Sequence, residues 1–127
     1  MNDCKECMAL SKEFKDCQKA FIAIGDETRQ QIIIALLESD YQGIRVGDIT
    51  KNTHLSRATV SHHLKILKDA NIISMRREGT MNYYFMNASD TQWSKIMNLV
   101  QHINEIINTM SEEEKQIYNR TESEPDF

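Results

Sequence analysis

The run from Ser56 to Lys68 gathers side chains that suit contact with a nucleic acid. Arg57, Lys65 and Lys68 carry the positive charge that phosphate attracts, and an arginine can also bind the edge of a guanine through two hydrogen bonds. The hydroxyls of residues 59 and 61 suit short contacts with bases or phosphates. The pattern therefore indicates either a DNA-contacting helix or the solvated polar face of an ordinary amphipathic helix.

The charge of the chain is unevenly distributed along it. The whole chain of 127 residues has a formal net charge of −4, which by itself disfavours a nucleic-acid partner. Residues 42–85, however, hold seven basic and three acidic side chains, whereas residues 111–127 hold two basic and six acidic ones. A local basic patch can bind phosphate whatever the total charge, although ordinary variation of surface charge would give the same excess.

Two pairs of closely spaced residues could bind a metal ion or respond to oxidation. Cys4 and Cys7 are separated by two residues, so they could give two thiolates to a metal, form a redox disulfide or be ordinary surface thiols. His102 and Glu105 lie one helical turn apart and could ligate together, but two ligands leave a metal under-coordinated. Cys17 falls in an apolar stripe and is expected to be buried.

Several function classes are disfavoured by what the sequence lacks. It shows no pair of nucleophile and base, no phosphate-binding loop and no complete metal centre, so we expect no enzyme. No apolar run approaches the length of a membrane span, and the odd number of cysteines without an export signal indicates a cytoplasmic protein. We expect one domain over residues 1–119 and an acidic, disordered tail over residues 120–127.

Hydrophobic periodicity predicts a mainly helical chain. A helix is expected over residues 5–24, ended by Gly25, and the next is expected to be capped by Asp26 and buried on nearly every side. A short helix over 46–52 precedes a turn and a Ser56 cap, and a helix over 57–70 directs Val60, Leu64 and Leu67 inward. A last long helix is expected to carry the apolar residues from Trp93 to Met110 and to be capped by residue 90 or 91, and residues 111–114 indicate either a new cap or a short extension.

Residues 72–75 and 81–86 are β-prone and flank a charged segment that contains Gly79. They predict a β-hairpin whose tip carries Arg76 and Arg77 close to backbone phosphates. Two short helices joined by a turn and followed by a hairpin form a winged helix-turn-helix. His63 flanks the apolar stripe of its helix, so we expect it to be packed or hydrogen-bonded rather than to contact a base.

Three motifs in order resemble the ArsR/SmtB family of small bacterial regulators. Residues 25–32 (GDETRQQI) are similar to the family's ADPTRLRIL opening, and residues 56–73 (SRATVSHHLKILKDANII) resemble its SQSTVSRHLKVLRDAGLV recognition helix. Residues 76–85 (RREGTMNYYF) resemble its RREGRWVYYRL wing. The match covers about residues 20–110.

This resemblance implies a homodimeric repressor that binds a double-stranded DNA operator and is released by an inducer. It implies DNA contacts at five matching residues: Ser56, Arg57, Thr59, Ser61 and His62. It also implies dimerisation through the first and last helices, where the apolar stripes could equally be plain core. The residues expected there are Leu10, Phe14, Phe21, Trp93, Met97, Val100, Ile103 and Ile107.

The resemblance also points to two places where relatives bind a metal. Arg45 and Gly47 stand where one site has cysteines, and they cannot ligate a soft metal. His102 and Glu105 match the second half of the other site, whose first half falls on unsuitable residues at 89 and 91. Cys4 and Cys7 are the favoured sensor, so a transition-metal ion or a redox signal stays open as the inducer. The alternative function is a winged-helix module that binds protein without operator binding.

Overall fold

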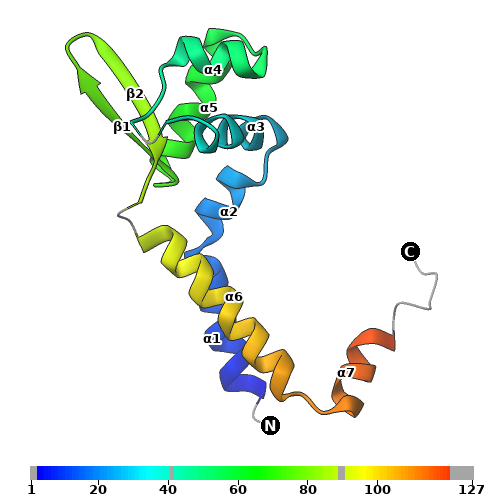
Figure 1. The fold of residues 1–127 in the computed structure, drawn as a ribbon. Coiled ribbons are helices and arrows are strands. Elements are labelled where there is room, and N and C mark those ends of the chain that lie inside the picture. The colour runs from blue at the N-terminus through cyan, green and yellow to red at the C-terminus, as the bar shows by residue number, and fades with distance from the viewer. Residues whose placement is uncertain (1–2, 41, 89–90, 121–127) are drawn as a thin grey trace.

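The computed structural model of the chain describes residues 3–40, 42–88 and 91–120. Its elements follow one another in this order: α1 (Asp3–Asp16), α2 (Gln18–Ile24), α3 (Glu27–Leu37), α4 (Val46–Thr53), α5 (Arg57–Asp69), β1 (Ile73–Glu78), β2 (Met81–Met86), α6 (Thr91–Thr109) and α7 (Glu112–Asn119). Residues 18–88 form a head, from which α1 and α6 extend side by side as an arm that ends near α7 (Figure 1). The predicted winged helix-turn-helix is confirmed.

The core of the head is built around α5. Val60, Leu64 and Leu67 are at most 1% exposed and pack with buried residues of α2, α3 and α4, as the periodicity predicts. Ser56 caps this helix, because its side-chain oxygen accepts the Thr59 backbone N–H at 3.1 Å. The burial of one face leaves the opposite face of α5 in solvent.

The helix predicted over residues 5–24 is wrong as a single helix. It breaks at Cys17, whose N–H is shared between the carbonyl oxygens of Glu13 and Phe14 at 3.2 and 3.1 Å. The break separates α1, which packs on α6, from α2, which packs on α3 and α5. Cys17 itself is buried, as expected, and burial is the main cause that raises the pKa of its thiol.

Gly25 ends α2 as predicted, but not through a left-handed conformation. Its φ of −83° is accessible to any residue. A Cβ atom at this position would lie 2.9 Å from the carbonyl oxygen of Phe21, so glycine is required by the close approach of the backbone.

The prediction that the third helix is buried on nearly every side is wrong. Ile32, Ala35 and Leu36 are buried in α3, whereas Ile34 and Leu37 are 52% and 64% exposed. The partners of α3 among the described elements, which include α2, α4, α5 and β2, occupy only one of its sides. An apolar run can therefore mark a surface helix when the fold covers one face only.

The hairpin, which we call the wing, has a shorter loop than expected. Its strands pair from Ile73 with Met86 to Glu78 with Met81, so only Gly79 and Thr80 form the turn. The prediction that Arg76 and Arg77 lie in the tip is wrong, because the tight turn extends the ladder and places both in β1. Gly79 has a φ of +63°, which suits glycine at such a turn.

The predicted cap at the start of α7 is confirmed as a capping box. Ser111 accepts the Glu114 N–H, and the Glu114 carboxylate accepts the Ser111 N–H. Residue 90, one of the two caps expected for α6, lies outside the described residues, and the other, Thr91, is the first residue of that helix. Residues 121–127 of the predicted tail also lie outside the described residues, so the boundary at residue 119 stays a prediction. None of the described helices is long and apolar enough to cross a membrane.

Arg29 joins α2 to α5. Asp26 accepts the backbone N–H of Arg29 at 3.0 Å and so caps α3, as predicted. The Arg29 guanidinium donates to the carbonyl oxygens of Ala23 and Ile22 at 2.6 and 3.1 Å, and it lies 3.2 Å from Nδ1 of His63. A cation thus satisfies the end of α2 while it contacts α5.

We expect Arg29→Met to lower the free energy of unfolding by about 2–3 kcal/mol, because the variant leaves the α2 carbonyls without their charged donor. Urea denaturation measures the loss. Arg77→Met is the matched control, since the Arg77 side chain donates only to the exposed turn carbonyl of Gly79, and it should stay within about 0.5 kcal/mol of the parent. Equal losses in the two variants would contradict the joining role of Arg29.

Candidate nucleic-acid interface

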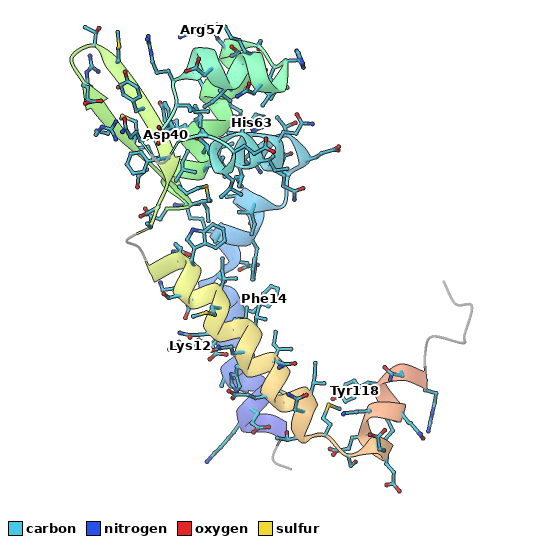
Figure 2. The ribbon with its side chains drawn as sticks, in the orientation of Figure 1. Lys12, Phe14, Asp40, Arg57, His63 and Tyr118 are labelled. Atoms are coloured by element: carbon cyan, nitrogen blue, oxygen red, sulfur yellow. The ribbon has the colours of Figure 1, made fainter. Side chains whose placement is uncertain are left out.

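The exposed face of α5 carries most of the side chains predicted to contact DNA. Arg57, at the first position of the helix, lies at the end of the head that is farthest from the arm (Figure 2). The other exposed members of this set are Ser56, Ser61, His62, Lys65 and Lys68, whereas Thr59 is partly buried. The structure therefore brings all seven residues to one helix and leaves six of them open to a partner.

The hydroxyls at the start of α5 have structural partners. Ser56 accepts from the Thr59 backbone and donates to the Thr59 hydroxyl at 2.9 Å, so its oxygen already stabilises the helix. The hydroxyl hydrogen of Thr59 is left to donate to a phosphate or a base. These contacts fix the first turn of α5, where base contacts are made in helices of this kind.

The two lysines of α5 differ in their surroundings. Lys65 lies 3.6 Å from Asp69 one turn later, and both side chains are more than half exposed. Such a surface pair is weak, so a phosphate can replace the carboxylate. Lys68 forms no ion pair with a described residue and is exposed at the last turn of the helix.

The wing arginines are held against the wing itself. Arg76 donates to the carbonyl oxygen of Gln42 and to Glu78 at 2.9 and 3.1 Å, and its guanidinium carbon lies 5.2 Å from the centre of the Tyr83 ring. Arg77 donates to the carbonyl oxygen of the turn residue 79 at 3.1 Å. Both charges therefore lie along β1, and the one on Arg76 is partly neutralised.

A polar cavity of about 350 Å³ lies between the start of α4, the start of α5 and the tip of the wing. Arg45, Lys51 and Arg57 line it together with Thr80 of the wing turn. Sequence reasoning missed Arg45 and Lys51 as candidates. Their signal is a basic residue directly before, and one within, the first helix of the pair, but their approach to the wing is a tertiary feature.

His62 and His63 point to different surroundings although they are neighbours. His62 is exposed, whereas His63 is half-buried and lies against Arg29, which confirms the prediction for His63. Burial lowers the pKa of His63; Asp26 opposes this effect, and Arg29 and His62 add to it. The neutral form is favoured because only a neutral imidazole can accept the Arg29 N–H.

The arm exposes a row of large apolar side chains. Leu10 and Phe21 are partly buried, whereas the other residues predicted for dimerisation are 36–56% exposed: Phe14, Trp93, Met97, Val100, Ile103 and Ile107. Leu99, by contrast, is only 2% exposed. The stripe on α6 is thus not plain core within one chain.

The metal candidates whose side chains the structure describes are not assembled into a centre. Nδ1 of His102 lies 2.7 Å from the Glu13 carboxylate of α1, and this hydrogen bond is the main cause that raises the pKa of His102. Glu105 and Cys7 are exposed, and the side chain of Cys4 lies outside what the structure describes. Across residues 3–40, 42–88 and 91–120, no three histidine, cysteine or acidic side chains are placed to hold a metal.

We expect His63 and His102 to titrate on opposite sides of the ordinary histidine pKa of 6.5. The lowered pKa of His63 adds stability above pH 6.5 that is lost as the pH falls toward its folded pKa. The raised pKa of His102 adds stability that is complete below pH 6.5 and is lost as the pH rises through its folded pKa. Proton NMR titration of the imidazole resonances measures both values.

His63→Gln and His102→Gln assign the two resonances by removing one each. Midpoints for both histidines on the same side of 6.5 would contradict the surroundings described for them.

The comparisons with known proteins agree with this geometry. Residues 26–75 match the sequence model described as "Bacterial regulatory protein, arsR family". The transcriptional repressor SdpR of Bacillus subtilis is 40% identical over 72 residues, which are 57% of this chain and 77% of SdpR. The arsenical resistance operon repressor of the same organism is 32% identical over 77 residues, 61% of this chain and 71% of that protein.

Solved structures share the fold. A crystal structure of an ArsR family transcriptional regulator covers 74% of this chain and 92% of its own, with a TM-score of 0.61 at 15% identity. At that identity the likeness shows the fold alone. With the motif match and the extent of the similarity to SdpR, the chain belongs to the arsR family of bacterial regulatory proteins.

Proposed function

We propose that the chain represses transcription as a homodimer that binds an inverted-repeat operator and leaves it when an inducer acts. Membership of the arsR family makes it a DNA-binding regulator rather than an enzyme. The observation that carries the proposal is that α5 buries Val60, Leu64 and Leu67 and presents its polar face beside the wing. An α-helix fits the major groove of DNA, so this face can meet base edges.

Arg57 is the residue we propose to read a base. It is exposed at the first turn of α5 and forms no hydrogen bond with a described residue, so both of its terminal nitrogens can reach a guanine. Ser61 and His62 follow one turn later on the exposed side. Lys65, Lys68 and the wing arginines 76 and 77 are proposed to contact phosphates. This basic surface disfavours the alternative of a module that binds only protein.

The apolar row on the arm supports the proposed dimer. A soluble chain seldom exposes so many large apolar side chains in one region without a partner. A second copy of the same arm would cover them in a symmetric interface. Such a dimer would place the two α5 helices about 34 Å apart, so that both enter the major groove on one side of the DNA.

We propose that the inducer acts at the arm. Cys4 and Cys7 belong to α1, which packs along α6, so a metal or an oxidant at these thiols could change how the two arms meet. His102 and Glu105 are less suited to a metal, because Glu13 already engages His102. The proposed site of action is the cytoplasm, where thiols stay reduced until a signal arrives.

Arg57→Ala should weaken binding to the promoter region of the protein's own gene by about 5–150-fold and reduce the preference over random DNA, because one base contact is lost. Lys68→Ala should weaken binding to both duplexes alike, since a phosphate carries no sequence information. Fluorescence anisotropy measures the six dissociation constants of the parent and the two variants on the two duplexes. Equal losses on the two duplexes for Arg57→Ala would contradict base reading by Arg57.

Met97→Glu should weaken the dimer by at least about 100-fold, because it places a carboxylate in the apolar interface. Ile34→Glu on α3 is the matched control, since Ile34 and Met97 are 52% and 54% exposed and Ile34 lies in the head. Light scattering across micromolar concentrations measures the mass of each variant. A monomeric parent, or an unchanged dimer of Met97→Glu, would contradict the proposed interface.

A further inference from the structure

Three cations line the cavity between α4 and the wing tip without a partner in the described structure. The side chains of Arg45, Lys51 and Arg57 form no hydrogen bond or ion pair with a described residue. Lys68 is also unpaired but lies at the last turn of α5, whereas Lys65 is paired with Asp69 and Arg76 with Glu78. The cavity therefore brings three unpaired positive charges together.

The balance of charge favours an anion. Asp48 is the one acidic residue among the described residues that line the cavity, so their net charge is +2. The lining is predominantly polar, and Thr80 brings a hydroxyl from the wing side. A cavity of about 350 Å³ leaves room for an anion that stays joined to a longer chain.

The start of α4 adds to this preference. Asp26, Ser56 and Ser111 cap α3, α5 and α7 with a side-chain oxygen, whereas Arg45 makes no such bond at α4. The carbonyl oxygen of Arg45 accepts the N–H groups of Asp48 and Ile49, which leaves those of Val46 and Gly47, two residues that line the cavity, at the positive end of the helix dipole. The Arg57 guanidinium lies close to this helix start, because a Cβ at Gly47 would be in ordinary van der Waals contact with its Nη1, at 3.6 Å.

We infer that this cavity binds one backbone phosphate of the operator, held by Arg45 directly before α4, by Lys51 in the last turn of α4 and by Thr80 of the wing. The inference rests on the proposed DNA binding and adds two residues to the interface. A phosphate in this position would join the wing to α4 and hold Arg57 next to the groove. Charge-assisted hydrogen bonds to phosphate are stronger than neutral ones, so the contact adds affinity without adding sequence preference.

The test is the salt dependence of DNA binding by an Arg45→Gln/Lys51→Gln double variant. One lost phosphate contact should make the slope of log K against log salt concentration less negative by about 0.9. Affinity at low salt should fall about tenfold on promoter and random duplexes alike. Lys12→Gln is the matched control, because Lys12 lies on the arm, far from Arg57 (Figure 2). The salt dependence of DNA binding by this variant should have the same slope as that of the parent.

Duplexes with single neutral methylphosphonate linkages identify the phosphate itself. At one position the neutral linkage should weaken DNA binding by the parent protein. At the same position it should leave DNA binding by the double variant unchanged. Inorganic phosphate in place of chloride, at equal ionic strength, tests a free anion as the occupant. If phosphate competes with DNA and no neutral linkage distinguishes the two proteins, the cavity binds a free anion and the inference is overturned.

The outcomes also separate this inference from the proposed function. A parent that binds the promoter, with a double variant of unchanged slope, overturns the phosphate site alone. A parent that binds no DNA at low salt overturns both. Thermal unfolding by circular dichroism should be the same for parent and variants, since both substituted side chains are exposed.

Discussion

The burial of one face of α5 is the constraint on which the rest of the structure depends. Val60, Leu64 and Leu67 are almost inaccessible to solvent. Replacing a leucine buried in this way by alanine typically lowers the free energy of unfolding by about 2–5 kcal/mol. Rotating the helix about its axis would expose all three side chains to solvent. Their burial therefore fixes the orientation of the polar face of α5. The Ser56 cap sets where the helix begins and α4 packs beside it, while the wing follows its end. The exposed side chains are thereby held in place by the core beneath them.

Arg29 connects that helix to α2, the helix that follows α1 of the arm. Its guanidinium holds the last carbonyls of α2 and contacts His63 of α5, so the end of the segment leading from the arm and the recognition helix share one cation. The His102–Glu13 pair fixes α1 to α6 within the arm in the same way. The Arg29–His63 and Glu13–His102 contacts each combine a histidine with a charged partner. The surroundings of the two histidines shift their pKa values in opposite directions.

The buried face of α5 and three helix caps could be predicted from the sequence, because they depend on short-range patterns. The inward residues of α5 follow the helical period, and the caps at Asp26, Ser56 and Ser111 depend only on neighbouring residues. The break at Cys17 has no such signal, since it arises where the chain changes packing partners. The contact of Arg29 with His63 spans 34 residues and that of Glu13 with His102 spans 89, so neither leaves a pattern in the sequence. The cavity between α4 and the wing is tertiary for the same reason.

A hydroxyl-radical footprint of the protein on the promoter region of its own gene tests the account most directly. Two copies of α5 held by paired arms should protect two segments on one face of the duplex, with centres about 10 base pairs apart or a multiple of that spacing. The protection should fade as salt is raised, because phosphate contacts release counterions. A single protected segment would contradict the dimeric geometry. No protection at low salt would contradict the reading of α5 and the wing as a DNA-binding surface.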